Sequence, residues 1–238
     1  MLIETNQADA VICVGSESTL TETFISGLAA AHALSTNNDD PKHASRPFDA
    51  ARDGFVMGEG GGAIIIESEE NAKKRNATIL AEIAGYANST DGYHATSPHP
   101  EGIGAIFCME EAIRKAGISK EEVKYINTHG TSTPVGDPIE AKAIEKVFGE
   151  AAYDIAVNST KGATGHMMGA GGITELITCI KCIETGIIPP TLNLENPDEN
   201  LPKLNYVPNK TQQKKVDIAM SNSFGFGGQN SSILVKRY

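Results

Sequence analysis

The sequence predicts an α/β fold in which helices pack against the faces of a sheet. Short apolar segments of strand length alternate with segments whose apolar residues recur at helical spacing. A chain of 238 residues is long enough to bury a core without disulfides or metals. Its 40% apolar and 21% charged residues are typical of a soluble domain, and no apolar run approaches the ~18 residues of a membrane span.

The first part of the chain is predicted to hold strands, helices and one long irregular segment. An unbroken apolar run that stops at Gly15 indicates a fully buried strand, and the apolar residues that follow it have helical spacing. In order we expect strand 10–14, helix 17–34, strand 63–66, helix 68–75 and strand 78–86. Residues 35–62 are rich in Asn, Asp, Pro and Gly, and this length indicates a functional or interface loop.

The second part has clearer helix boundaries. Gly117 ends one helix, and Ser119 with Glu122 forms a capping box after it. Asp137 is the expected N-cap of another helix, which stops at Gly149. In order we expect helix 104–116, strand 125–127, helix 137–148, strand 155–159, helix 167–184, and strands 217–222 and 231–236.

Charge and cysteine content exclude several classes of protein. The net charge is −10, and the basic residues form only short runs. Nucleic-acid binding is therefore not expected. Cys13, Cys108, Cys179 and Cys182 are scattered through apolar segments, which indicates a reducing compartment rather than a disulfide framework. His129 and His166 are far apart in the sequence, and no cysteine or acidic residue flanks either of them at ligand spacing, so no metal site is expected.

The first candidate site segment is Thr128–Pro134, which follows a predicted strand. His129 then lies at the carboxyl edge of the sheet, where open α/β sheets place their ligands. The alternative is a core histidine whose ring bonds a backbone carbonyl.

The second candidate segment is Ser159–His166, between a strand and a helix. His166 is expected near the start of that helix, where the helix dipole favours a neutral imidazole that can donate a hydrogen bond to an oxyanion. Lys161 can pair with Glu175, and the alternative for Lys161 is a surface loop.

The third candidate segment is Ser221–Asn230, which joins the last two strands. Phe224 and Phe226 alternate with glycine, a pattern that does not suit a plain hairpin. The backbone N–H groups of this segment can serve as an oxyanion hole, and the two phenylalanine rings can gate an apolar tunnel. The alternative is a glycine-rich hairpin with exposed aromatics.

Two other glycine clusters, 58–62 and 169–172, lack the sequence context of a nucleotide-binding site.

Taken together, these segments resemble the β-ketoacyl-acyl carrier protein synthases, and most closely the elongating synthases of the second type. The matching runs are Asn127–Pro134, Ser159–Lys161, Thr164–His166 and Asn222–Gly228. The resemblance implies a thiolase-like fold, an αβαβα layered sandwich whose N-terminal half is incomplete here. Residues 1–76 then end the N-terminal half and residues 77–238 form the C-terminal half.

The resemblance also implies the chemistry of the site. In this family a cysteine takes an acyl chain, malonyl carrier protein is decarboxylated, and the carbanion attacks the acyl thioester. His129 and His166 match the histidines that support decarboxylation, Lys161 the lysine that orders the site, and Glu175 its structural partner. The expected substrate-binding residues are Thr131, Thr133, Phe224, Phe226, Gly227, His94 and Thr96. Phe226 matches the gating aromatic of the family, and His94 and Thr96 resemble the entrance of the tunnel for the phosphopantetheine arm.

The resemblance implies no cofactor, because the phosphopantetheine arm arrives on acyl carrier protein. It further implies a cytoplasmic homodimer that binds neither nucleic acid nor membrane. No segment matches the nucleophilic cysteine, and Met1–Ile3 resembles the end of an apolar helix, so we expect a chain that begins inside a larger fold with apolar surface exposed. A non-catalytic partner subunit, like a chain-length factor, is the alternative. A thiolase is rejected because the Phe-Gly-Phe-Gly-Gly loop replaces its C-terminal cysteine turn.

Overall fold

The computed structural model describes all 238 residues and contains one sheet of five strands and two sheets of two strands. The strands are β1 Ala10–Glu17, β2 Gly60–Glu67, β3 Glu82–Thr90, β4 Tyr125–Asn127, β5 Ala156–Asn158, β6 Ile187–Ile188, β7 Gln212–Gln213, β8 Ile218–Gly225 and β9 Gln229–Lys236. The α-helices are α1 Glu22–Ala30, α2 Glu69–Lys74, α3 Ile103–Ala116, α4 Gly136–Phe148, α5 Lys161–Thr164 and α6 Met168–Thr185.

The main sheet has five strands in the order β3-β9-β8-β4-β5. Strand β4 is parallel to both β5 and β8, whereas β9 is antiparallel to β8 and β3. The carboxyl ends of β4, β5 and β8 therefore meet at one edge of the sheet. The three candidate segments follow or end these strands, so the topology brings them together.

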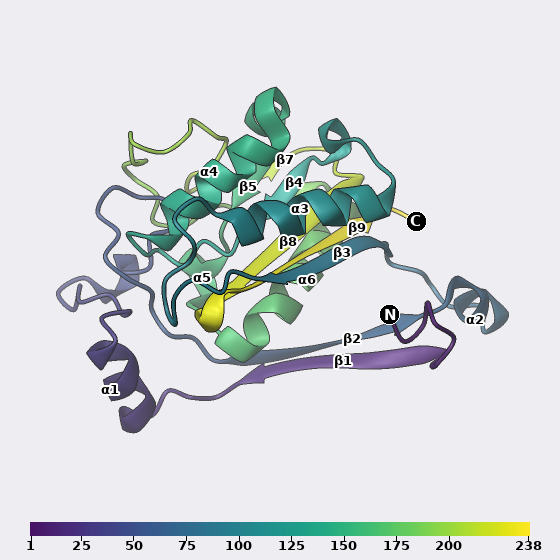
Figure 1. Cartoon of the computed structure of the whole chain (residues 1–238), viewed down its shortest axis with the longest axis horizontal. Coiled ribbons are helices and arrows are strands. Elements are labelled where there is room, and N and C mark those ends of the chain that lie inside the picture. The colour runs from purple at the N-terminus through teal and green to yellow at the C-terminus, as the bar shows by residue number, and fades with distance from the viewer.

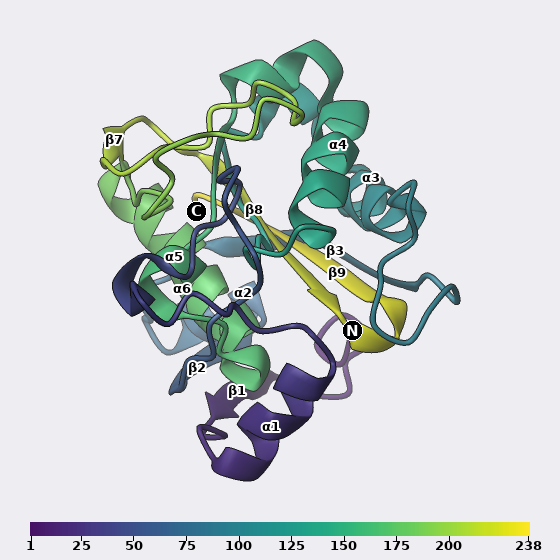
Figure 2. The same cartoon turned by 90° about the vertical axis from the view of Figure 1, so that its left-hand side faces the viewer.

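The elements form four successive layers (Figure 1). Helices α3 and α4 cover one face of the main sheet, and α6 lies between its other face and the β1–β2 pair. One apolar core fills the space beneath α3 and α4, and a second joins the sheet to α6. In the view turned by 90°, α1 projects away from the body of the molecule (Figure 2), and none of its residues is buried.

Glycines allow α6 to approach the β1–β2 pair closely. A Cβ on Gly15 would lie 2.8 Å from the carbonyl oxygen of Gly169, and a Cβ on Gly62 would lie 3.1 Å from Ile173 Cγ2. Both contacts would be tighter than ordinary packing allows. Gly15 and Gly62 on the strands, and Gly169 on the helix, therefore serve helix–sheet packing.

Several sequence predictions are confirmed in the second part of the chain. Helix α3 ends at Gly117 with a φ of 65°, and the capping box of Ser119 and Glu122 is present. The predicted strands at β4 and β5 and the helix at α6 lie within two residues of their predicted bounds. The reason is that caps and apolar periodicity are local signals.

The predictions were less accurate near the N-terminus. Strand β1 is not fully buried: its residues alternate, and Ile12 is 70% and Val14 69% exposed. The helix predicted over 17–34 is only Glu22–Ala30, and the strand predicted over 78–86 is Glu82–Thr90. Because Ile65 of β2 is also 65% exposed, the expected apolar surface is present on the β1–β2 pair.

The start of α4 also differs from its prediction. The helix begins at Gly136 with Val135 as N-cap, and Asp137 lies inside the first turn. The Asp137 carboxylate accepts hydrogen bonds from the amides of Phe48 and Thr133. Asp137 thus joins distant segments instead of capping its own helix.

No helix of the structure is both long and apolar enough to cross a bilayer.

Candidate active site

A cavity of about 990 Å³ opens at the carboxyl edge of the main sheet. The predicted site residues that line it are His129, His166, Lys161, Glu175, Thr131, Thr133, Thr96, Phe224 and Phe226. His94 and Gly227 do not line it. The His94 ring nitrogen Nδ1 instead accepts hydrogen bonds from the amides of Thr96 and Ser97, each at 3.2 Å.

The two predicted histidines are neighbours inside this cavity. Their rings meet edge to face with centroids 5.3 Å apart, although they follow different strands. The Phe224 ring lies 5.9 Å from the His129 ring, and the Phe55 ring lies 5.1 Å from that of His166. The two imidazoles therefore share one partly aromatic pocket.

Both imidazoles are held in the neutral form. Burial, followed by the nearby Lys161 ammonium and His166, lowers the pKa of His129 well below its usual range. Burial, with a further contribution from Lys161, lowers the pKa of His166 to about 3. His166 lies two residues before the start of α6, near the helix end where the sequence predicts it; a contribution of the helix dipole stays a prediction. A neutral imidazole carries one N–H donor, and the Nδ1 atom of His166 has no partner.

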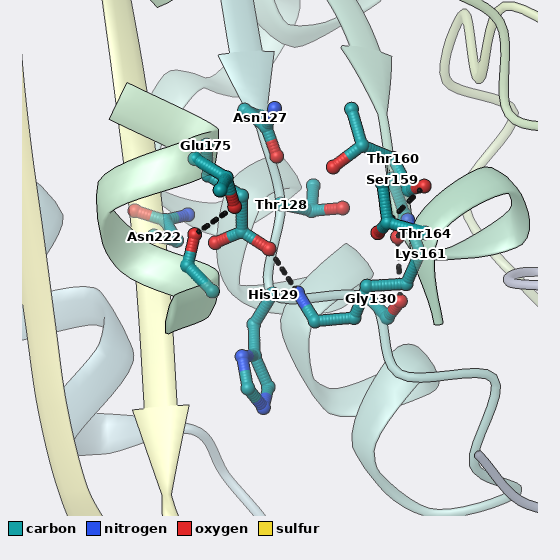
Figure 3. Close-up of polar contacts among 12 residues, drawn as sticks. Asn127, Thr128, His129, Gly130, Ser159, Thr160, Lys161, Thr164, Glu175 and Asn222 are labelled. Atoms are coloured by element: carbon teal, nitrogen blue, oxygen red, sulfur yellow. Dashed lines mark hydrogen bonds and ion pairs between the residues drawn. The ribbon is translucent and has the colours of Figure 1, made fainter. Parts of the chain in front are cut away.

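Lys161 and Glu175 form a buried ion pair beside the histidines. The side chain of Lys161 crosses from α5 to Glu175 on α6, with His129 below them (Figure 3). Each side chain is 3% exposed. Burial raises the pKa of Glu175, and the Lys161 ammonium opposes that shift. The predicted surface-loop alternative for Lys161 is wrong.

Ser159 fixes the start of α5 relative to the histidine loop. Its hydroxyl donates to the carbonyl oxygen of Gly130 at 2.6 Å and accepts from the amide of Lys161 at 3.2 Å (Figure 3). Gly130 has a φ of 30°, and a Cβ there would lie 2.7 Å from that of Ser159. The glycine thus permits the two loops to pack against each other.

The long irregular segment predicted over 35–62 contacts the loop that carries His166. The amide of His166 donates to the carbonyl oxygen of Val56 at 2.7 Å, and the amide of Gly58 donates to that of His166 at 3.1 Å. The Ser45 hydroxyl donates to the carbonyl oxygen of Lys161 at 2.7 Å. The segment therefore fixes the backbone that carries His166 and Lys161.

The glycine-rich turn closes one side of the cavity. Strands β8 and β9 are paired antiparallel neighbours, so the segment is a hairpin, contrary to the prediction from its sequence. Phe226 at the tip is 51% exposed, while Phe224 is partly buried within β8. The amide of Gly227 donates to the carbonyl oxygen of Ala95 at 2.7 Å, which links the turn to the loop that carries Thr96.

Two buried carboxylates support the His129 loop, a role that the sequence did not predict. Glu140 and Asp137, near the start of α4, accept backbone hydrogen bonds from the loop residues His129, Gly130 and Thr133. Their helical spacing is visible in the sequence, but their acceptor role depends on where the loop folds.

No cysteine lines the cavity. Cys108, Cys179 and Cys182 are buried elsewhere, and burial raises the pKa of each thiol, that of Cys182 to about 12. Cys13 lies on β1, beside a second and smaller cavity of about 250 Å³ between β1–β2, α6 and β8–β9. The structure contains no group of three or more His, Cys, Asp or Glu residues that could hold a metal ion.

Two family models match most of the chain. The N-terminal domain of β-ketoacyl synthase matches residues 1–72, and its C-terminal domain matches residues 80–195. The chain belongs to the β-ketoacyl synthase family. The predicted division after residue 76 stays a prediction.

Curated relatives agree with this family. A 3-oxoacyl-[acyl-carrier-protein] synthase 2 of Coxiella burnetii is 53% identical over 99% of this chain and 57% of its own length. The chloroplastic synthase II of Arabidopsis thaliana is 47% identical over 98% of the chain and 43% of its own length. The chain therefore spans about half the length of the curated relatives it matches.

Solved ketosynthases share the fold. A type II PKS ketosynthase in complex with its acyl-carrier protein has a TM-score of 0.96 at 37% identity, covering 100% of this chain and 58% of that chain. A β-ketoacyl synthase from Burkholderia phymatum has a TM-score of 0.94 at 34% identity, covering 100% of this chain and 57% of that one. The predicted thiolase-like fold class is thus confirmed.

Proposed function

We propose that this chain carries the decarboxylating and thioester-stabilising residues of a condensing enzyme of fatty-acid biosynthesis. The observation that carries the proposal is the contact between the neutral imidazoles of His129 and His166, whose ring centroids are 5.3 Å apart. The two rings lie beside the buried Lys161–Glu175 pair. The family and the relatives named 3-oxoacyl-[acyl-carrier-protein] synthase 2 support the same reaction class. The protein is on this proposal an acyltransferase.

The first step on this proposal is decarboxylation of a malonyl thioester. The bond between Cα and the carboxylate breaks and CO₂ leaves. The electron pair of the broken bond passes to the thioester carbonyl to give an enolate. N–H groups of His129 and His166 donate hydrogen bonds to the enolate oxygen. Because the neutral rings are already in place, they stabilise the charge with little reorganisation. Burial, with a further contribution from the Lys161 ammonium that Glu175 fixes, keeps both rings neutral.

The second step forms the carbon–carbon bond. The enolate carbon attacks the carbonyl carbon of an acyl thioester, and the bond from that carbon to the thiolate sulfur breaks. The product is a 3-oxoacyl thioester, longer by two carbons, and a free thiolate. No cysteine lines the cavity here. We therefore assign the thiolate to a residue outside these 238 positions.

The proposed partner is acyl carrier protein, which delivers both substrates on a phosphopantetheine arm. Thr131 and Thr133 line the cavity, and their hydroxyls lie 3.1 Å apart, so they offer a polar wall for the amides of that arm. Phe226 at the exposed turn is the proposed gate. No cofactor is needed, and we propose a cytoplasmic homodimer, as the family resemblance implies.

The test measures CO₂ release from malonyl-acyl carrier protein by the native protein. We expect His166→Ala to lower the rate by about 100-fold, because one oxyanion donor is removed. The matched control is Glu110→Gln, a change at an exposed position of α3 that does not line the cavity. Absence of CO₂ release from the unaltered protein, or an unchanged rate in His166→Ala, would contradict the proposal.

A non-catalytic partner subunit is the second candidate, favoured by the lack of a cysteine in the cavity. One solved neighbour, 33% identical to this chain, is the ishigamide ketosynthase/chain length factor. The two histidines and the Lys161–Glu175 pair argue for the first candidate, because burying an ion pair costs desolvation free energy that fold stability alone does not explain. Stable pairing with a complete synthase, with no turnover lost in His166→Ala, would favour the second.

A further inference from the structure

Glu140 holds the backbone of the loop that carries His129. Its Oε1 atom accepts a hydrogen bond from the amide of His129 at 2.9 Å, and its Oε2 atom accepts one from the amide of Gly130 at 2.8 Å. The residue is only 2% exposed. A carboxylate that receives two adjacent N–H groups with its two oxygens fixes both the position and the direction of that peptide segment.

The surroundings of Glu140 fix its carboxylate in turn. From β8, the Asn222 amide Nδ2 lies 3.4 Å from Oε1, and Asn222 Oδ1 accepts a bond from the Ser232 hydroxyl of β9 at 2.7 Å. This chain of contacts leads from the central strands of the main sheet to the His129 loop. Glu140 therefore connects the main sheet to the His129 loop, which Ser159 and Asp137 hold at Gly130 and Thr133.

The charge balance around Glu140 allows its protonation in the physiological range. Burial raises the pKa of Glu140 to about 7, and Asp137 on the same helix acts in the same direction. The amides of His129 and Gly130 and the Lys161 ammonium from α5 oppose that rise. From β8, the uncharged Asn222 amide approaches Glu140 Oε1 at 3.4 Å.

We propose that Glu140 is a positioning residue for His129, whose ionised carboxylate aligns the imidazole through the His129 and Gly130 amides and whose protonation loosens that alignment. This inference rests on the proposed decarboxylation. A protonated carboxyl group is a weaker acceptor for two N–H groups, because one oxygen now carries a hydrogen. The rate of decarboxylation then falls on the acid side of neutrality.

The histidines cannot account for such an acid limb. The pKa of His166 is lowered to about 3 and that of His129 well below its usual range, so both rings remain neutral around pH 6. Asp137 is the other group that titrates nearby, since burial raises its pKa to about 6. Its carboxylate bonds Phe48 and Thr133 instead of the His129 amide. Asp137→Asn is therefore the variant that separates the two carboxylates.

The experiment compares Glu140→Gln with the unaltered protein in malonyl-acyl carrier protein decarboxylation across about pH 5 to 9. The amide group of Gln keeps the shape but places an NH₂ against one backbone N–H. We expect kcat to fall about 10-fold, with KM little changed, because misplacement of a catalytic group lowers the rate more than binding. We also expect the acid limb near pH 7 to disappear in Glu140→Gln. In Asp137→Asn it should persist but move to lower pH, because the Asp137 charge is one of the causes that raise the pKa of Glu140.

A second measurement does not depend on activity or on a variant that folds. Isotope-labelled histidine and glycine report the His129 and Gly130 amide NMR signals of the unaltered protein. Both should move together with an inflection near pH 7. An unchanged pH profile in Glu140→Gln, or amide signals without an inflection between about pH 6 and 8, overturns the inference. Failure of the unaltered protein to release CO₂ contradicts the proposed function, and the amide signals then decide the role of Glu140 by themselves.

Discussion

The imidazole of His166 lies edge to face against that of His129, with ring centroids 5.3 Å apart and an interplanar angle of 83°. The two residues follow adjacent parallel strands, β4 and β5, whose carboxyl ends lie side by side. This contact places two neutral donors in one cavity and determines what the protein can do chemically. It also makes the behaviour of each ring measurable.

The depressed pKa of His166 predicts a stability change with pH. In the unfolded chain this imidazole binds a proton below about pH 6.5, whereas in the folded protein it stays neutral down to about pH 3. The contribution of His166 to stability is therefore present at pH 7 and decreases as the pH falls. Relative to His166→Gln, the unaltered protein should lose about 2 kcal/mol between about pH 7 and 5. Urea unfolding at the two pH values measures this difference, and parallel curves for both proteins would contradict it.

The Lys161–Glu175 pair predicts strong non-additivity. Both side chains are buried, so Glu175→Leu leaves an unpaired ammonium and should destabilise the fold by about 3–5 kcal/mol. Lys161→Met/Glu175→Leu removes both charges and should recover most of that loss, yet remain inactive. Denaturant unfolding of the single and double variants tests the coupling. Equal losses that simply add in the double variant would show that the pair is not coupled.

The glycine next to the His166 loop predicts a steric effect on activity. A Cβ on Gly58 would lie 2.2 Å from the carbonyl oxygen of Thr164, so the backbone before His166 must move. We expect Gly58→Ala to cost about 1–3 kcal/mol of stability and to lower the decarboxylation rate. Gly27→Ala is the control: it lies in α1 with nothing within 4 Å, and it should raise helix stability by up to about 1 kcal/mol. Equal effects of the two changes would refute the steric argument.

Cysteine burial predicts which thiols react. Cys108, Cys179 and Cys182 are buried, and the pKa of each is raised, so little thiolate is present near neutral pH. A maleimide should label the folded protein at Cys13 only, and all four positions after denaturation. Mass spectrometry of the labelled peptides is the measurement. Rapid labelling of Cys182 in the folded protein would show that α6 opens readily.

Local signals explain which parts of the fold were predictable. The αL glycine after α3 and the capping box at Ser119 act within a few residues, so their outcome does not depend on distant contacts. The exposure of β1 does depend on such contacts. An unbroken apolar run suits a buried strand, but only α6 on one side covers it in this structure. The opposite face therefore leaves Ile12 and Val14 exposed.

The sequence by itself determined the family, the alternation of strands and helices in the second part, and the candidate residues His129, His166, Lys161 and Glu175. Only the tertiary structure decided that burial and the neighbouring Lys161 keep the rings neutral. It also left His94 outside the cavity and gave Glu140 two amides to hold. The physical reason is that residue type and spacing are encoded locally, whereas desolvation and loop direction depend on what the rest of the chain packs around each group.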